Sequence, residues 1–206
     1  MTSSSVGAYD ILIFDLFGVV IAFDEDLVYR RIAEHCSDPT AAFTGMRGLV
    51  SNPDLIRGRR TLTQLHRELC HNYGLKLDLP SFETVWHVPY SEPMPGMADL
   101  LQSLSQRYKL LLLSNVDRYY WQVVKAHHPE LRCFSKYLLS WELGQAKPER
   151  AAFTYAIQSA DSSASKCFFI DDKAENIEAA EALGLRGHRF AGLEGLLEAL
   201  RQNGIS

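Results

Sequence analysis

Several polar and charged side chains stand directly after short apolar runs of the sequence. They are Asp15 after Ile11–Phe14, Ser114 and Asn115 after Leu110–Leu113, Lys147 a few positions after Tyr137–Leu139, and Asp171 and Asp172 after Cys167–Ile170. If the apolar runs are parallel strands, their carboxyl ends meet at one edge of a sheet, where such sheets bind ligands. The sequence therefore predicts that these groups converge on one crevice.

That crevice would hold the three carboxylates Asp15, Asp171 and Asp172 and the ammonium group of Lys147. Like charges a few ångströms apart at low effective dielectric repel each other by on the order of several kcal/mol. A divalent cation relieves this repulsion, and oxygen ligands select a hard ion such as Mg²⁺, which bridges readily to phosphate. We therefore expect a magnesium site at this edge of the sheet.

The same groups suit the transfer of a phosphoryl group. An aspartate beside the ion can attack phosphorus and form an aspartyl-phosphate. Ser114 and Asn115 can donate hydrogen bonds to the non-bridging oxygens, while Lys147 neutralises charge on the transferred group. The residues therefore indicate chemistry on a phosphate group.

A sheet and the helices that cover it must position these side chains. The four apolar runs predict buried strands, and Leu185–Phe190 is a candidate fifth. Continuous apolar runs are typical of a parallel sheet covered on both faces. Helical patterns lie between them, at Gly96–Gln106, Glu149–Ser159, Ala174–Leu183 with Gly184 as C-cap, and Leu193–Arg201. The alternation of strand and helix predicts an α/β fold with a doubly wound parallel sheet.

Residues 24–92 follow a different pattern. Helical spacing recurs at Leu27–His35, Leu62–Tyr73 and Ser81–His87, with no convincing strand, and Pro93, Pro95 and Gly96 mark the exit. We expect a helical insertion at 24–92, placed directly after the first strand, and a core formed by residues 1–23 and 93–206.

Length and composition fit a globular protein and exclude several classes. The 206 residues are 47% hydrophobic and 22% charged, with a formal net charge of −4. No excess of positive charge is present to drive binding to nucleic acid or to an anionic membrane. The longest apolar stretch, Ile11–Phe23, is interrupted at Asp15 and is too short to span a bilayer. The four cysteines stand far apart without a CxxC pair, which favours reduced thiols in a cytoplasmic protein.

Four segments, in this order, resemble the four motifs of the haloacid dehalogenase-like hydrolase superfamily. They are FDLFGVV at 14–20, LLLLSN at 110–115, GQAKP at 144–148 and FFIDDKAEN at 168–176. Each motif is degenerate alone, but the ordered set is specific and covers essentially the whole chain. The wider segments SNVDRYYW, HHPELRCFSKYLLSWELGQAKPE and FFIDDKAENIEAA are most similar to the sugar-1-phosphate phosphatase and epoxide-hydrolase N-domain branch.

The resemblance implies a Rossmann-like core, an inserted helical cap, Mg²⁺ and hydrolysis of a phosphate ester. By position, Asp15 corresponds to the nucleophile and to a metal ligand. The backbone carbonyl of Phe17 and the carboxylate of Asp172 correspond to further metal ligands. Asp171 is expected to orient Lys147 or a metal-bound water, and it is an additional candidate ligand.

The resemblance also implies how the phosphate is held. Ser114 and Asn115 correspond to the phosphate-binding second motif, and Lys147 corresponds to the cation of the third motif. Together with Asp15, Ser114 and Lys147 form the expected catalytic set.

One position departs from the family pattern. Phosphatases of this superfamily usually carry a second aspartate two residues after the nucleophile, which acts as general acid and base, but here Phe17 occupies that position. General acid–base help is worth roughly 10²–10⁴-fold in rate. Three interpretations stay open: a slower phosphatase that prefers a good leaving group, such as an anomeric hydroxyl or a phenol; a phosphatase that uses an insertion residue or water for the proton; or a protein with another function.

Two other functions follow from that third interpretation. In halide-releasing members of the superfamily the position of Phe17 is often aromatic, and an early arginine of the cap holds the substrate carboxylate. Arg47 is the candidate for this role, with Asp15 displacing halide from a 2-haloacid. The pair Asp171–Asp172 argues against it, because metal-free dehalogenation has no evident use for two more carboxylates. The other function is that of a fold that only binds a ligand or partner.

The basic run Arg57, Arg59 and Arg60 is typical of a solvated face rather than of a binding site. The oligomeric state, monomer or homodimer, is not fixed by any of these patterns. The predicted function is a cytoplasmic, Mg²⁺-dependent phosphatase of a small phosphorylated metabolite, a sugar phosphate among the candidates, acting through an aspartyl-phosphate on Asp15. Neither nucleic acid nor a membrane is an expected partner.

Overall fold

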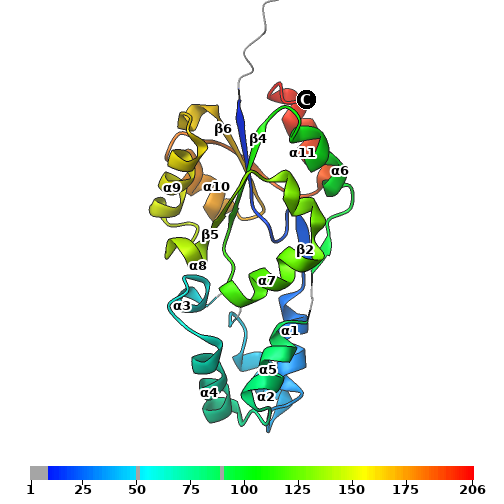
Figure 1. Cartoon of the computed structure of the whole chain (residues 1–206), viewed down its shortest axis with the longest axis vertical. Helices are drawn as coiled ribbons and strands as arrows, with labels where there is room; N and C mark the ends of the chain where they lie inside the picture. Colours follow the sequence, from blue (N-terminus) through cyan, green and yellow to red (C-terminus); the bar gives the residue numbers. More distant parts are fainter. Residues whose placement is uncertain (1–8, 50–51, 89–90) are drawn as a thin grey trace, which may run out of the picture.

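A five-stranded parallel sheet with strand order β5-β4-β1-β6-β7 forms the centre of the molecule (Figure 1). The computed structural model describes residues 9–49, 52–88 and 91–206. The strands are β1 (Ile11–Phe14), β4 (Lys109–Ser114), β5 (Lys136–Leu139), β6 (Cys167–Asp171) and β7 (Arg186–Arg189). The predicted α/β fold and all five predicted strands are confirmed. β4 and β6 extend to include Ser114 and Asp171, so these two polar residues are the last residues of their strands.

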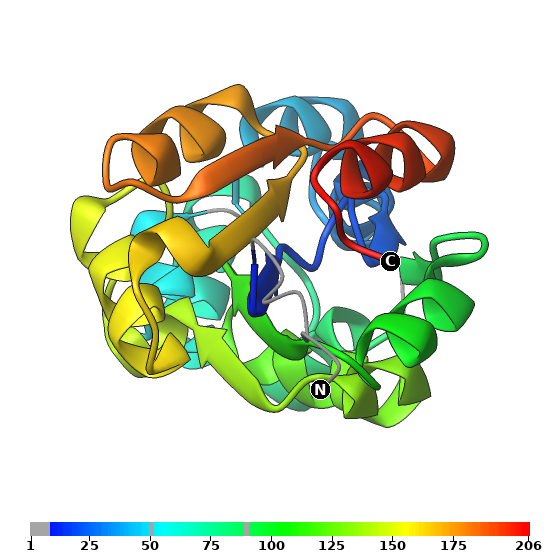
Figure 2. The same cartoon turned by 90° about the horizontal axis from the view of Figure 1, so that it is seen from above.

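The sheet is buried on both faces, as its continuous apolar runs require. Along β1, Ile11 and Ile13 pack against one set of helices, while Leu12 and Phe14 pack against the other. The first set is α9 (Arg150–Ala160) and α10 (Ala174–Glu181), and the second is α6 (Met97–Leu104), α7 (Arg118–His127) and α11 (Leu193–Gln202). Figure 2 shows these helices around both faces of the sheet.

The predicted helices are present, with differences at their ends. α10 ends at Glu181, two residues before the predicted end. Gly184 closes the helix as predicted: it adopts φ +87°, its N–H donates to the carbonyl of Glu181, and the N–H of Leu185 donates to the carbonyl of Ala180, which is the Schellman pattern. The helix α7 was not predicted.

Five further helices form a segment between the first two strands of the large sheet in chain order. They are α1 (Glu25–Ala33), α2 (Pro39–Gly45), α3 (Pro53–Ile56), α4 (Leu62–Tyr73) and α5 (Leu79–Trp86). We call these helices and the residues that join them the helical segment. Figure 1 shows them gathered at one end of the molecule, beyond the sheet. Tyr29, Leu65, Phe82 and Trp86 are fully buried between these helices. Their apolar core is continuous with that under one face of the sheet.

Two short strands connect the sheet to the helical segment. β2 (Ile21–Phe23) pairs antiparallel with β3 (Ser91–Pro93), with Ile21 opposite Pro93. Residues Ser91 and Glu92 were expected to contain no strand, and that expectation is wrong. Strands of three residues, one of them ending in proline, give no alternation that a sequence pattern can reveal. As a result, the chain leaves the sheet and returns to it along two hydrogen-bonded neighbours.

The remaining elements are short: α8 (Ser140–Leu143) and the 3₁₀ helices η1 (Pro129–Cys133) and η2 (Ala164–Lys166). The four cysteines are free thiols. Among the residues that the structure describes, no helix combines the length and the apolar character that crossing a membrane requires.

Candidate active site

A cavity of about 520 Å³ opens at the carboxyl edge of the sheet. Loops after β1, β4, β5 and β6 contribute Asp15, Asn115, Lys147 and Asp172 to its lining. The helical segment contributes Ile56 and Arg57. Groups from distant parts of the sequence therefore meet at the edge where parallel sheets bind their ligands.

Lys147 links two of the three carboxylates. Its Nζ lies 2.7 Å from Oδ1 of Asp15 and 2.6 Å from Oδ2 of Asp171, and its side chain is only 1% exposed. Burial disfavours the ammonium form, but the two carboxylates outweigh it and raise the pKa of Lys147. An ammonium group has three donors, so one remains for a ligand oxygen.

Asp171 is fully buried and is surrounded by hydrogen-bond donors. Oδ1 accepts from the N–H of Lys173 at 2.9 Å, and Nδ2 of Asn176 donates to Oδ1 at 2.9 Å and to Oδ2 at 3.0 Å. Burial favours the neutral acid, but Lys147 and these donors outweigh it and lower the pKa of Asp171. Because both oxygens are already occupied, Asp171 is suited to hold Lys147 in place, which is one of the two roles predicted for it.

Asp15 is 6% exposed and directs one oxygen to two donors. Oδ1 accepts from the N–H of Leu16 at 2.6 Å and from Lys147. Burial raises the pKa of Asp15 to about 7, against the opposing effect of Lys147, and the nearby charge of Asp171 adds to the rise. The carboxylates of Asp15 and Asp171 thus share the ammonium group of Lys147, and all three groups are shielded from solvent.

The site has the composition of a divalent-cation site. Carboxylate oxygens of Asp15, Asp171 and Asp172 all lie within 4.8 Å of one another. With one ammonium group beside them, three ionised carboxylates leave an excess of negative charge. Among the described residues, Oδ1 of Asp172 is buried without a hydrogen-bond partner, and burial followed by the charge of Asp171 raises its pKa. A hard cation would neutralise this charge and occupy that oxygen, so the residues fit Mg²⁺.

A glycine allows Asp172 to approach the loop after β1. A Cβ atom added to Gly18 would lie 2.8 Å from Oδ2 of Asp172, and Gly18 adopts φ +79°, a conformation that other residues rarely adopt. The sequence FDLFGVV therefore places glycine where the loop and the carboxylate meet.

Asn115 contacts Lys147 and lines the cavity, whereas Ser114, the last residue of β4, is not on the cavity lining. The Ser114 hydroxyl is buried and has no partner among the described residues, a costly state that a bound anion would relieve. The side chain of Asn115 donates to the carbonyl of Lys147 at 2.8 Å and accepts from its N–H at 2.9 Å. Asn115 thereby fixes the Lys147 loop and keeps one amide N–H for a ligand.

Neither Ser114 nor Asn115 caps a helix. The N-cap of α7 is Asp117, whose Oδ1 accepts from the N–H groups of Tyr119 at 2.8 Å and Tyr120 at 2.9 Å. Asp117 is buried on the cavity lining, and burial raises its pKa. This residue was not predicted, although an aspartate just before a helix is a recognisable capping pattern.

Phe17 lies on the cavity lining with two other aromatic residues. Its ring centroid is 4.6 Å from that of Phe23 on β2 and 6.2 Å from that of Tyr120 on α7, the latter in a stacked arrangement. We call Phe17, Phe23 and Tyr120 the aromatic wall. A packed ring therefore occupies the position where the resemblance noted in the sequence leads one to expect a proton-donating aspartate.

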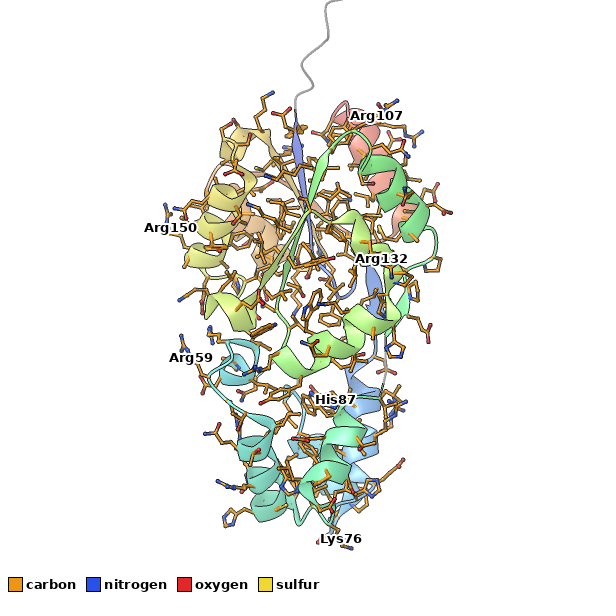
Figure 3. The ribbon with its side chains drawn as sticks, in the orientation of Figure 1. Arg59, Lys76, His87, Arg107, Arg132 and Arg150 are labelled. Atoms are coloured by element: carbon orange, nitrogen blue, oxygen red, sulfur yellow. The ribbon has the colours of Figure 1, made fainter. Side chains whose placement is uncertain are left out.

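The arginines of the helical segment lie differently from expectation. Arg57 lines the cavity and forms an ion pair with Glu149, so the interpretation of this residue as part of a solvated face is wrong. Nη2 of Arg59 donates to the carbonyl of Gly144 at 3.3 Å, and Figure 3 shows Arg59 at the outer edge of the junction with α8. Arg60 pairs with Glu68. Sequence alone gave no signal for these contacts, because they depend on how the α3 loop folds against the sheet.

Arg47 does not lie on the cavity lining. Its side chain is 66% exposed, pairs with Asp26 at 3.7 Å and lies over the ring of Phe43. This arrangement offers no support for Arg47 as the holder of a substrate carboxylate.

One buried hydroxyl connects the helical segment to the core. Oγ of Ser140 donates to the carbonyl of Ile56 at 2.5 Å and accepts from the N–H of Val116 at 3.0 Å. Ile56 and Val116 both line the cavity. Ser140 therefore fixes two parts of the cavity wall relative to each other.

Comparison with known proteins gives consistent results. The sequence profile of the haloacid dehalogenase-like hydrolases matches residues 9–184. D-ribitol-5-phosphate phosphatase from Bacteroides thetaiotaomicron is 23% identical over 180 residues, which are 84% of this chain and 87% of that protein. Sesquiterpene phosphatase astK from Aspergillus oryzae is 27% identical over 122 residues, 57% of this chain and 62% of that protein. A magnesium complex of a HAD family enzyme from Bacteroides thetaiotaomicron superposes with a TM-score of 0.79 at 23% identity, covering 94% of this chain and 99% of that one.

Proposed function

The chain belongs to the haloacid dehalogenase-like hydrolase family, and from this membership we propose that it is a Mg²⁺-dependent phosphatase of a small phosphorylated molecule. One observation carries the proposal: Nζ of Lys147 lies 2.7 Å from Asp15 and 2.6 Å from Asp171, and carboxylate oxygens of Asp15, Asp171 and Asp172 lie within 4.8 Å of one another. This arrangement places a nucleophile and a cation in one cavity, and the buried Ser114 hydroxyl, without a partner among the described residues, is available as an anion-binding group.

The reaction has two steps. A carboxylate oxygen of Asp15 attacks phosphorus, the bond between phosphorus and the leaving oxygen breaks, and an aspartyl-phosphate forms. The leaving alkoxide takes a proton from solvent. Water then attacks the phosphorus of the aspartyl-phosphate, which releases inorganic phosphate and restores Asp15.

The surrounding residues hold the phosphoryl oxygens. Lys147 has one free N–H, Ser114 has a free hydroxyl and Asn115 has one free amide N–H, and all three can donate as negative charge develops. Asp15, Asp172 and the backbone carbonyl of Phe17 would hold Mg²⁺, with Asp171 securing Lys147 rather than ligating the ion. When bound, the ion neutralises charge on the phosphoryl group.

The leaving group is expected to matter more than in related phosphatases. No proton donor stands at Phe17, and Oδ1 of Asp117 is engaged with the first turn of α7. General acid catalysis raises the rate by about 10²–10⁴-fold. Because it is missing here, esters of alcohols that leave readily without protonation are the better substrates.

We also propose that residues 24–92 act as a cap over a core of residues 1–23 and 93–206. The contacts of Ser140 with Ile56 and of Arg57 with Glu149 support this division, since they join the helical segment to the core at the cavity. Closure would exclude bulk water and supply selectivity.

The test is hydrolysis of p-nitrophenyl phosphate with and without Mg²⁺. We expect turnover that a chelator abolishes and that Asp15→Asn lowers by about 10⁴-fold or more, because the nucleophile is lost. Asp161→Asn, at an exposed carboxylate 75% accessible to solvent, is the matched control and should keep its activity. Turnover that survives Asp15→Asn would overturn the proposal.

The two alternative functions give different results in the same experiment. Chloride release from a 2-haloacid that is insensitive to chelator and lost in Arg47→Ala would indicate a dehalogenase. Binding of Mg²⁺ without turnover of any phosphate ester or haloacid would indicate a protein that only binds. Either result would reject the phosphatase.

A further inference from the structure

The geometry points to a more specific substrate class: a phosphate ester whose leaving group is a flat, apolar alcohol, with its ring seated against the aromatic wall. This inference rests on the proposed function, because it takes the phosphate to be held at Asp15 and Lys147. It concerns the other part of the same cavity, of which only Phe17 belongs to one of the four sequence motifs.

The cavity lining divides into a charged part and an apolar part. Asp15, Lys147 and Asp172 supply the charges. The aromatic wall supplies three rings whose centroids are 4.6 and 6.2 Å apart in successive pairs, and Ile56 and Val116 add two aliphatic side chains. A phosphate ester bound with its phosphorus at Asp15 therefore has an apolar surface available for its leaving group. That surface begins at Phe17, two residues after the nucleophile in the sequence.

Three other charged side chains line the cavity, and two of them, Arg57 and Asp117, are already engaged; the third is Lys173. Arg57 is neutralised by Glu149, which itself accepts a hydrogen bond from the N–H of Ala146 at 3.1 Å. Asp117 accepts from two backbone N–H groups. A polyol placed against the aromatic wall would lose its hydration and find Arg57 and Asp117 occupied, whereas an apolar ring loses no hydrogen bond on entering.

The chemistry at position 17 selects in the same direction. Phe17 cannot protonate a leaving oxygen, but it can pack against the ring that carries that oxygen. Phenols leave more easily without protonation than simple alcohols do. A phenol satisfies both conditions, and a benzyl alcohol satisfies only the packing condition, so the two conditions can be measured separately.

The experiment compares benzyl phosphate with glycerol 3-phosphate in the presence of Mg²⁺. Both are phosphates of primary alcohols, so the comparison holds the type of leaving oxygen constant and changes the polarity of the group attached to it. Burial of one ring predicts a kcat/KM about 10–100-fold higher for benzyl phosphate. Equal values, or a higher value for glycerol 3-phosphate, would overturn the inference.

Variants of the aromatic wall locate the preference. Phe23→Ala and the milder, still apolar Phe23→Leu should both lower the ratio of the two kcat/KM values, Phe23→Ala by about tenfold. Tyr155→Ala removes an exposed aromatic residue on α9, outside the cavity, and should keep the ratio. Because Phe23→Leu retains an apolar side chain on β2, it keeps the test valid if Phe23→Ala unfolds. A ratio unchanged in a folded Phe23 variant would contradict the inference.

A binding measurement separates this inference from the proposed function. Calorimetry with Mg²⁺ compares benzylphosphonate with 2-hydroxyethylphosphonate, neither of which has a phosphate ester bond to hydrolyse. Binding of benzylphosphonate about tenfold tighter supports the apolar subsite even if no ester is turned over, in which case only the phosphatase proposal fails. Turnover of both esters together with equal phosphonate affinities overturns the inference and leaves the phosphatase proposal standing.

Discussion

The two parts of the cavity are held together by different forces. In the charged part, Lys147, Asp171 and Asn176 form a network in which each polar atom of Asp171 accepts two hydrogen bonds at 2.6–3.0 Å. In the apolar part, the rings of Phe17 in the loop after β1, Phe23 on β2 and Tyr120 on α7 pack against one another. The charged part is therefore geometrically demanding, whereas the apolar part tolerates substitution of one apolar side chain by another.

This difference implies that the two parts of the cavity have separate roles in catalysis and in substrate selection. Changes in the charged part should affect every substrate equally, because all substrates share the phosphoryl group. Changes in the aromatic wall should affect substrates according to their leaving groups. The following variants test that division, in order of decreasing expected effect.

Lys147→Met should have the largest effect. It removes the cation of the charged part and leaves Asp15 and Asp171 buried without their common partner. We expect kcat/KM to fall by about 10²–10³-fold for benzyl phosphate and glycerol 3-phosphate alike, and the free energy of unfolding to fall by about 3–5 kcal/mol. Steady-state kinetics and urea denaturation measure the two quantities.

Lys109→Met is the matched control for that variant. Lys109 pairs with Asp161 at 3.3 Å at the amino end of β4, far from the cavity lining, so its replacement should cost about 0–1 kcal/mol. If Lys147→Met changed the ratio of the two kcat/KM values by as much as it changed either one, the division between the two parts would be wrong.

Asn176→Ala should have the second largest effect. The amide of Asn176 donates to both oxygens of Asp171, which in turn fixes Lys147. Loss of such an orienting group typically costs about 10–100-fold in activity or metal affinity. Kinetics and Mg²⁺ titration measure both. Asn203→Ala, at a side chain outside the cavity lining that donates to the carbonyl of Ala199 and accepts from the hydroxyl of Tyr9, should change neither; a decrease as large in the control would point to general destabilisation instead.

Phe17→Asp should raise turnover of an alkyl phosphate more than turnover of an aryl phosphate. The new carboxyl group can donate a proton, so kcat should rise about tenfold for glycerol 3-phosphate. A smaller gain is expected for p-nitrophenyl phosphate, whose leaving group needs no proton. Phe17→Asn has the same shape without the proton and should give no gain. Equal gains for both esters would contradict the leaving-group explanation.

Ser140→Ala should have the smallest effect on turnover. It leaves the carbonyl of Ile56 and the N–H of Val116 without their shared partner, which predicts a loss of about 1–3 kcal/mol in the free energy of unfolding. We expect a few-fold rise in KM as the cavity wall loosens. Ser135→Ala removes a comparable hydrogen bond, to the carbonyl of Leu110 at 2.8 Å, at the amino end of β5, and should leave KM unchanged.

Sequence reasoning succeeded where the charged groups are adjacent to strands. Asp15, Ser114 and Asp171 stand at the ends of strands whose continuous apolar runs are easily recognised. The rule for parallel sheets then predicts that these strand ends lie at one edge of the sheet. Lys147 needed the family motif as well, because it lies eight residues beyond the end of a weak strand, β5.

The aromatic wall and its surroundings could not be predicted in the same way. Phe23 is on β2, a strand too short to show a pattern, and Tyr120 is on the unpredicted helix α7. Arg57 lies on the cavity lining although a solvated face was expected for it, and Arg47, the candidate for a substrate contact, lies outside the cavity. The folding of helices α1–α5 decides where each side chain points. The part of the cavity that we propose selects the leaving group is thus the part least visible in the sequence.

The pairing of β2 with β3 has an evolutionary consequence. Because the entry and the exit of the intervening 67 residues (24–90) are hydrogen-bonded neighbours, that stretch can be shortened, lengthened or exchanged for another without altering strand order in the sheet. Phe23 lies on the entry strand itself, so a graft made at this junction could replace the helices and still retain one ring of the pocket. The fold therefore offers a natural splice point for recombining one hydrolytic centre with many recognition modules.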